Sequence, residues 1–146
     1  MTTIAWDGVW LAADSMCSLG SIRYTTRKLV RLTDGGLLGA AGKTNEITKL
    51  VKWLNGDLPT MPKISSLHAI HVTPESLVYL YAGGCDDMPV LDQYVAVGTG
   101  GDIALGAMES GKSAHLAVEI ACRRDSGSGP PVESITLRPA AGLTSR

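Results

Sequence analysis

The first residues of the chain have the pattern of a β-hairpin, with Asp7-Gly8 between two apolar runs at residues 2–6 and 9–13. Asp-Gly is a strong signal for a two-residue turn, because such turns require positive φ at their centre. This loop sets Thr2 opposite Ala13 across the hairpin. The second run is apolar without alternation, which indicates a strand that is covered on both faces. We therefore expect a buried antiparallel strand pair at the N-terminus.

Apolar periodicity predicts the remaining elements. Ile47, Leu50 and Leu54 mark one face of a helix that Thr44 can cap and Gly56 can close. The expected strands are residues 28–32, 36–41, 67–72, 77–81, 94–97 and 132–137, and the expected helices are residues 44–55, 102–110 and 113–124. The order ββββαββ–βααβ predicts an α/β (α+β) fold with two antiparallel sheets and helices outside them, a four-layer αββα sandwich.

Length and charge restrict the classes of function. The chain has 146 residues, 45% of them hydrophobic, which suits one domain over residues 1–146 with a frayed polar tail from about 139 to 146. A net charge of -1 gives no electrostatic reason to expect nucleic acid or an anionic membrane as partner.

Cysteine spacing and the N-terminal residues indicate the compartment. Cys17, Cys85 and Cys122 are widely spaced without a CxxC pair, so we expect reduced thiols and no disulfide framework or zinc site. The chain starts without the basic and long apolar segments of a signal peptide, and no run approaches the ~18–20 apolar residues of a transmembrane helix. These features predict a cytoplasmic protein.

Three sequence patterns resemble ligand-binding motifs but lack the structural context that binding would require. Residues 106–113 match the phosphate-loop pattern GxxxxGKS, but their first half reads as helix, whereas the motif requires a loop directly after a buried strand. Residues 98–101 open like a dinucleotide fingerprint, but Ile103 stands in place of its third glycine. His68 and His71 point to opposite faces of a strand and cannot share a metal ion. His115 is expected on a helix surface.

Thr2 is the candidate nucleophile. Methionine before a small residue is removed by methionine aminopeptidases, and an N-terminal threonine carries its own general base, an α-amine with a pKa of about 8. A cation at Lys28 would help to activate the hydroxyl, and Asp14 would hold that lysine. The alternative reading of the same residues is structural: Thr2 as a β-forming residue, Lys28 as a surface charge and Asp14 as a strand terminator.

The order of several segments resembles the proteasome β-subunit/HslV family of N-terminal nucleophile (threonine) peptidases. They are TTIAWDGVWLAADS, RKLVRL, GAAGKT, AVGTGGDIALGAME and the loop at residues 125–129. The resemblance covers most of the chain, from Thr2 to about Leu137. It implies a threonine-type endopeptidase that hydrolyses peptide bonds.

The resemblance also assigns roles to single residues. It implies that Thr2 is the nucleophile, Lys28 the tuning charge and Asp14 its carboxylate partner. Gly42 would supply an oxyanion-hole N–H, and Thr99 would contact the terminal amine in place of the family's serine. Asp125 and Ser128 would support the threonine from behind. Backbone carbonyls of Cys122, Asp125 and Ser128 are the matching positions for a structural monovalent or divalent cation; no cofactor is required.

Departures from the family pattern concern the helices and the assembly. The segment between Leu54 and Leu67 is too short for a second long helix, so the helical layer is trimmed, and Pro130 follows Gly129 where many relatives have glycine. The family implies a peptide or unfolded protein substrate, a homo-oligomeric ring and an ATPase unfoldase, although no residue pattern indicates the ATPase. Ala40, Ala41 and Lys43 are candidate pocket residues.

Two other functions compete with the peptidase. One is an N-terminal nucleophile amidohydrolase acting on small amides. The other is a non-catalytic, proteasome-like structural subunit, which retention of Met1 would favour because the amine would then be blocked. Cleavage preference, ring size and physiological substrate do not follow from the sequence.

Overall fold

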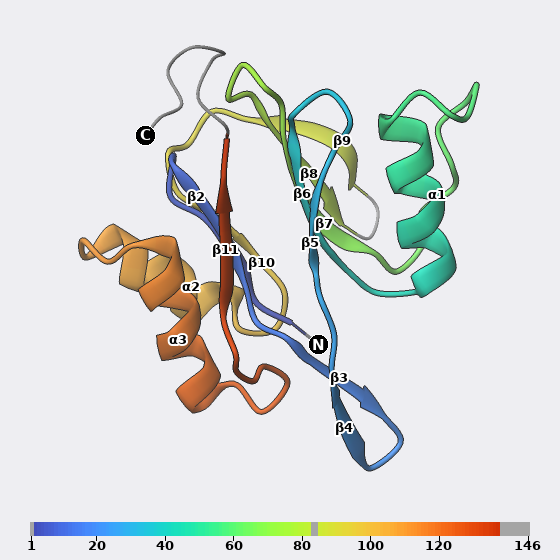
Figure 1. Cartoon of the computed structure of the whole chain (residues 1–146). Coiled ribbons are helices and arrows are strands. Elements are labelled where there is room, and N and C mark those ends of the chain that lie inside the picture. The colour runs from blue at the N-terminus through green and yellow to red at the C-terminus, as the bar shows by residue number, and fades with distance from the viewer. Residues whose placement is uncertain (1, 83–84, 138–146) are drawn as a thin grey trace, which may run out of the picture.

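The computed structural model describes residues 2–82 and 85–137, which form a mixed α/β structure with three helices and several sheets (Figure 1). Met1 and the tail expected to fray lie outside these residues. The strands are β1 Ile4–Trp6, β2 Trp10–Ala13, β3 Met16–Leu19, β4 Ile22–Thr25, β5 Leu29–Arg31, β6 Leu37–Ala41, β7 His68–Val72, β8 Val78–Ala82, β9 Cys85–Val90, β10 Val95–Val97 and β11 Glu133–Thr136, and the helices are α1 Thr44–Leu54, α2 Gly101–Glu109 and α3 Ala114–Arg124.

Antiparallel pairing organises the strands. A four-stranded sheet has the order β10-β1-β2-β11, and a five-stranded sheet has the order β5-β6-β7-β8-β9. The short hairpin β3-β4 is separate from both and projects from the body of the molecule (Figure 1). The first strand is central in its sheet, so the N-terminus of the described chain is held between neighbours on both sides.

Three hydrophobic clusters join these elements. One contains Ile4 and Leu11 of the four-stranded sheet together with Leu37 and Ile70 of the five-stranded sheet. A second joins β1 and β2 to α2 and α3, and a third joins β6 and β7 to α1. Each sheet thus shares one apolar face with the other sheet and one with helices, which explains why β2 is apolar without alternation.

Helix α1 ends as its sequence predicts but begins differently. Gly56 has a φ of +83°, and the N–H groups of Gly56 and Asp57 donate to the carbonyls of Trp53 and Lys52, the pattern of a Schellman cap. At the other end Lys43 is the N-cap and Thr44 is the first helical residue, and no side chain caps the helix. The expected capping role of Thr44 was therefore wrong.

The hairpin register differs from the expected one by two residues. Ala13 pairs with Ile4, not with Thr2, because the two-residue loop is Gly8-Val9 and not Asp7-Gly8. The Asp7 carboxylate determines this choice, since its Oδ1 accepts N–H bonds from Val9 at 2.8 Å and from Trp10 at 2.7 Å. A shift of two residues keeps each side chain on its predicted face.

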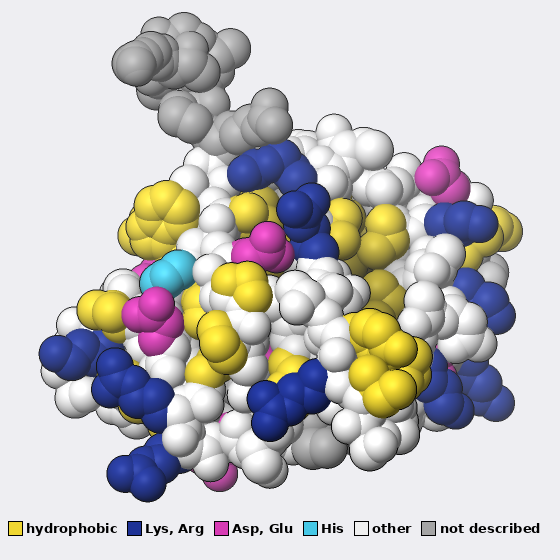
Figure 2. Space-filling model, turned by 60° about the horizontal axis from the view of Figure 1, so that its bottom comes forward, with side chains coloured by type: hydrophobic (Ala, Val, Ile, Leu, Met, Phe, Trp, Pro, Cys, Tyr) yellow, Lys and Arg dark blue, Asp and Glu magenta, His cyan; other side chains and the backbone are white. Residues whose placement is uncertain are grey.

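Sequence periodicity missed three strands. Hairpin β3-β4 exposes most of its residues, including Leu19, Ile22 and Tyr24, so it lacks the buried face that produces alternation. Strand β9 lies at the edge of its sheet and contains Pro89. Proline argues against a strand in the sequence, because it cannot donate a ladder hydrogen bond. In Figure 2 the bottom of the view in Figure 1 is turned forward. On the face seen there, hydrophobic side chains lie between charged side chains that are separated from one another.

Asp7 gives a test of the turn. Its Oδ2 also accepts the N–H of Ala114, the first residue of α3, at 2.9 Å, so the carboxylate fixes both the turn and a helix N-terminus. We expect Asp7→Ala to lower the free energy of unfolding by about 1–3 kcal/mol. Asp7→Asn should lower the free energy of unfolding by less, because the amide carbonyl oxygen can still accept the N–H bonds of Val9 and Trp10. Urea denaturation would rank the three proteins, and equal stability of the Asn and Ala variants would contradict this role.

Candidate active site

Thr2, Asp14 and Lys28 meet at the open end of the first hairpin. The Lys28 ammonium donates to Thr2 Oγ1 at 2.9 Å and to Asp14 Oδ1 at 2.8 Å, and Thr2 Oγ1 also donates to Asp14 Oδ1 at 2.9 Å. The side chains of Lys28 and Asp14 are only 5% and 0% exposed. A cation and a carboxylate are therefore both in contact with one hydroxyl in a site that excludes most water.

Backbone N–H groups complete the surroundings of the Asp14 carboxylate. Oδ1 accepts from Thr3 at 3.0 Å, and Oδ2 accepts from Met16 at 3.2 Å and from Gly129 at 3.1 Å. Burying a charge is costly unless it is paired and hydrogen-bonded. Asp14 meets both conditions, and its bonds also tie the loop before β11 to the start of β1.

A second polar cluster holds the other side of the threonine pair. Thr2 N lies 3.3 Å from Thr99 Oγ1, which donates to Asp125 Oδ2 at 2.7 Å. Ser128 Oγ also donates to Asp125 Oδ2, at 2.5 Å, and lies 2.7 Å from Thr3 Oγ1. Burial, the largest single influence, raises the pKa of Asp125, but the Ser128 and Thr99 hydroxyls, the Gly127 N–H and the positive N-terminus together lower it below the ordinary value.

Glycine at two positions permits the close packing around Thr2. Gly42 has a φ of +135°, and a Cβ there would lie 2.6 Å from the carbonyl oxygen of Ser66. Gly98 has a φ of +96°, and a Cβ there would lie 2.2 Å from the carbonyl oxygen of Thr2. Both positions therefore require glycine. The glycine cluster after β10 serves close approach to Thr2, in addition to the strand-to-helix turn that the sequence indicates.

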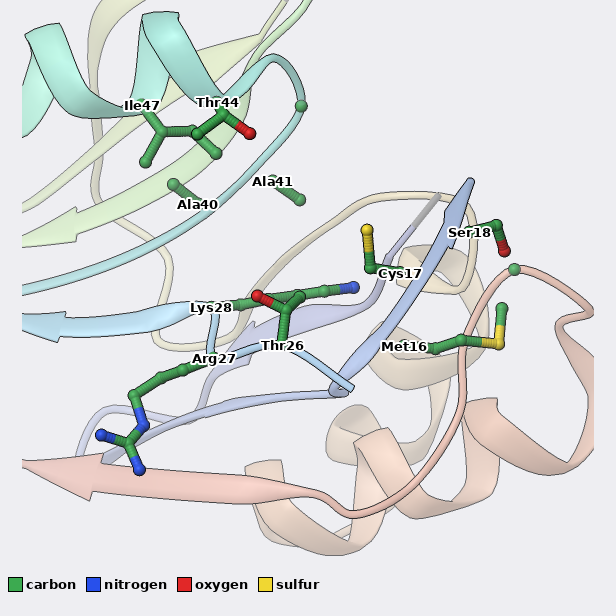
Figure 3. A pocket seen from close by; sticks show the side chains of 12 residues that line it. Met16, Cys17, Ser18, Thr26, Arg27, Lys28, Ala40, Ala41, Thr44 and Ile47 are labelled. Atoms are coloured by element: carbon green, nitrogen blue, oxygen red, sulfur yellow. The ribbon is translucent and has the colours of Figure 1, made fainter. Parts of the chain in front are cut away.

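Two cavities share Ala41 and Gly42 in their lining. We call the first the Lys28 cavity; its volume is about 370 Å³, and its lining includes Met16, Cys17, Lys28, Ala40 and Ile47. Figure 3 shows β6 and α1 on one side of it and β3 on the other. We call the second the Thr99 cavity; its volume is about 340 Å³, and its lining is Thr2, Ala41, Gly42, Ser66, His68, Gly98 and Thr99. Thr2 itself therefore lines the Thr99 cavity, and its hydroxyl partner Lys28 lines the Lys28 cavity.

Glu46 fixes the wall next to Gly42. This carboxylate on α1 accepts from Ser65 N at 3.1 Å, Ser65 Oγ at 2.6 Å and Ser66 N at 3.2 Å. The Ser65 hydroxyl is the main cause that lowers the pKa of Glu46, and burial opposes it. Because the Ser66 carbonyl packs on Gly42, the carboxylate holds the loop that defines Gly42's position.

The structure thus brings together every residue that the sequence singled out for catalysis. Thr2, Asp14 and Lys28 form one cluster; Thr99, Asp125 and Ser128 form the other; and Gly42 lines a cavity with Thr2. Ala40 and Ala41 line the Lys28 cavity, whereas Lys43 is the N-cap of α1 and lines neither cavity.

Sequence reasoning missed four residues of this site: Thr3, Glu46, Ser66 and His68. Only Thr3 carried a signal, the repeated threonine at the start of a strand that alternates its faces. The contacts of Glu46, Ser66 and His68 depend on a helix, a loop and a strand that meet only in the folded chain.

The motifs set aside by context have ordinary structural roles. Gly106 lies inside α2, Gly111 makes the turn between the helices with a φ of +103°, and Ser113 caps α3 through Leu116 N. His71 is buried and stacks on Tyr79, and burial lowers its pKa. His115 lies on α3, 2.6 Å from Ser134 Oγ.

The pH dependence of stability tests the Asp125 cluster. Because its pKa in the folded protein lies below the ordinary value of 3.8, the ionised carboxylate contributes stability that is fully present above that pH. This contribution is lost as pH falls through the folded pKa. Urea unfolding at stepped pH should show Asp125→Asn less stable than the wild type near neutrality, with the gap closing in acid. Asp57→Asn, on the exposed turn after α1, controls for the loss of a carboxylate; a gap constant with pH would contradict this account.

Amide hydrogen exchange tests the Glu46 contacts. In Glu46→Ala, the N–H groups of Ser65 and Ser66 lose their acceptor, so their exchange should accelerate by about tenfold or more. Ser65→Ala removes the hydroxyl but keeps both N–H bonds, and should have a smaller effect. Unchanged exchange at these two amides in Glu46→Ala would show that the carboxylate does not hold the loop.

Known proteins resemble this chain in sequence and in fold. No family model matches the sequence. The chain is 27% identical to proteasome subunit beta 1 of Thermococcus onnurineus over 90% of its own length and 83% of that protein's. It also matches two solved structures at 19% identity, which establishes similarity of fold.

Both structures are of BPH from Thiobacillus denitrificans. The first has a TM-score of 0.67 and covers 94% of this chain and 98% of that one. The second, BPH in complex with epoxomicin, has a TM-score of 0.68 and covers 94% and 99%. The chain thus resembles a proteasome β subunit in sequence and BPH in fold.

Proposed function

We propose that the chain is a threonine-type peptidase whose nucleophile is Thr2, exposed by removal of Met1. The observation that carries this function is the contact of Thr2 Oγ1 with both Lys28 Nζ and Asp14 Oδ1 at 2.9 Å, beside an open cavity. The relationship to a proteasome β subunit supports the same chemistry. An isolated threonine hydroxyl is a weak nucleophile, so this surrounding charge has a chemical purpose.

Each residue then has a defined role. In the processed chain, Thr2 N is an amine that takes the hydroxyl proton as Oγ1 attacks the substrate carbonyl. The positive charge of Lys28 favours the developing alkoxide, and Asp14 holds the ammonium in place. Asp125 orients the Thr99 hydroxyl toward the amine, and Ser128 positions Asp125. Gly42 N–H is our candidate donor to the oxyanion.

The assembly and architecture belong to the same proposal. The three hydrophobic clusters support a four-layer αββα sandwich with a trimmed helical layer and a single domain. By analogy with proteasome subunits, we propose a homo-oligomeric ring that acts on peptides or unfolded proteins in the cytoplasm, with an ATPase unfoldase as partner. None of the described helices is long and apolar enough to cross a membrane.

The end of α3 is a limited candidate for a structural cation. The Asp125 carboxylate already accepts from Thr99 and Ser128, and burial raises the pKa of the Cys122 thiol to about 11, so neither side chain suits a cation. Among residues 2–82 and 85–137, no group of three His, Cys, Asp or Glu side chains could hold a metal ion. A cation there would bind backbone carbonyls of Cys122, Asp125 and Ser128, and no catalytic step requires it.

Reaction with a peptide epoxyketone such as epoxomicin tests the function. The reagent closes a ring with both the hydroxyl and the free amine of an N-terminal threonine. Intact mass spectrometry should show loss of Met1 and one adduct per chain, and peptide hydrolysis should stop in proportion. Thr2→Ala, produced with the same processed start, should form no adduct and lose activity by at least about 10³-fold.

The other outcomes separate the competing functions. A processed chain that forms no adduct but hydrolyses small amides would support the amidohydrolase. A chain that retains Met1 and does not react would support the structural subunit and overturn the peptidase proposal.

A further inference from the structure

The two cavities beside Thr2 can be assigned to the two halves of a substrate, given the proposed function. During acylation Thr2 Oγ1 forms a bond to the carbonyl carbon while its proton passes to the α-amine. That ammonium then gives the proton to the substrate nitrogen, the C–N bond breaks, and a neutral amine leaves. The leaving nitrogen must therefore depart on the side of the Thr2 nitrogen.

The Thr2 nitrogen is close to the lining of the Thr99 cavity. It lies 3.3 Å from Thr99 Oγ1, and Thr99 and Gly98 line that cavity together with Thr2. The Lys28 cavity lies beyond the hydroxyl and has apolar lining from Met16 and Ile47, which suits the side chain of the acyl half. The leaving half of the substrate is thus directed toward the Thr99 cavity.

The far wall of the Thr99 cavity is polar and fixed. Ser66 and His68 line it with exposed side chains, one from the loop before β7 and the other from the first residue of that strand. His68 pairs with Ala41 in the sheet, and Glu46 holds Ser66 through its backbone N–H at 3.2 Å. The wall is therefore preformed and does not need to close over a substrate.

The lining offers hydrogen-bond donors and lacks acidic side chains. Ser66 can donate its hydroxyl and His68 a ring N–H, and the seven lining residues of this cavity include no aspartate or glutamate. Asp14 is buried behind the threonine pair, whereas Asp125 is partly exposed and accepts from the Thr99 hydroxyl that lines the cavity. A carboxylate brought into the cavity would meet these donors, and the Thr99 hydroxyl would stand between it and Asp125.

We propose that the Thr99 cavity binds the residue that follows the cleaved bond, and that His68 and Ser66 make it selective for an acidic side chain there. An aspartate or glutamate at that position accepts hydrogen bonds from both residues. A lysine can also bond to the Ser66 hydroxyl or to an unprotonated nitrogen of His68, but the lining of the cavity offers it no opposite charge. A leucine leaves the polar groups of both residues without a substrate partner.

Peptides that differ at one position test this selectivity. Internally quenched peptides would share all residues before the cleaved bond and carry Asp, Glu, Leu or Lys directly after it, with the cleaved bond identified by mass spectrometry. We expect kcat/KM for Asp and Glu to exceed that for Leu by about fivefold, the ratio that one added hydrogen bond produces. Lys should be cleaved less well than Asp or Glu, because no acidic side chain lines the cavity.

Variants at His68 assign the preference to this residue. His68→Ala should bring the Asp-to-Leu ratio close to one, and His68→Gln, which keeps an N–H donor, should retain part of it. His115→Gln removes an imidazole from α3 that is not part of the cavity lining, and should keep the wild-type ratio. Because each ratio compares two substrates of one protein, partial misfolding of a variant does not alter it.

The results separate this inference from the function on which it rests. Wild-type protein that forms the epoxyketone adduct at Thr2 but cleaves all four peptides equally would overturn the inference and leave the peptidase intact. A preference that persists in His68→Ala would also overturn it. Protein that forms no adduct and cleaves none of the peptides would overturn both.

Discussion

The buried ion pair between Lys28 and Asp14 determines how the active end of the molecule is built. Two charges that are almost fully removed from water must satisfy each other and all their remaining hydrogen-bonding capacity. Asp14 does so with N–H groups from Thr3, Met16 and Gly129. Segments that are more than a hundred residues apart are thereby joined around one carboxylate. The Thr2 hydroxyl is held in this arrangement because it supplies one of the contacts that the pair requires.

The two carboxylates of the site divide the control of Thr2 between its two ends. Asp14 acts on the hydroxyl, directly and through Lys28, whereas Asp125 acts on the nitrogen through Thr99. Neither carboxylate lines the Thr99 cavity, so the lining consists of neutral or basic groups. This separation keeps negative charge away from the position where an oxyanion would form, and it produces the donor-lined cavity that selects the leaving half of a substrate.

Local patterns predicted elements well where burial follows periodicity, and poorly where contacts depend on the complete fold. Helix α1 and both flanking strands of the first hairpin follow from apolar spacing, and the error of two residues in the hairpin register left every face unchanged. Hairpin β3-β4 could not be predicted, because its exposed residues share no core. The chemistry of an N-terminal threonine suggested Lys28 as the partner of Thr2, and the resemblance to proteasome subunits favoured this over a structural reading. Neither pattern nor resemblance could show that Glu46 and His68 approach the same cavity.

Stability alone does not explain the Lys28–Asp14 pair, and this bears on the choice between a peptidase and a structural subunit. Well-packed apolar residues in place of a buried ion pair are often neutral or stabilising by about 1–4 kcal/mol. A purely structural chain would therefore gain nothing from charges at this position. Here the ammonium contacts the threonine hydroxyl as closely as it contacts the carboxylate, and a cavity opens beside that threonine. The costly arrangement is explained when the hydroxyl must react.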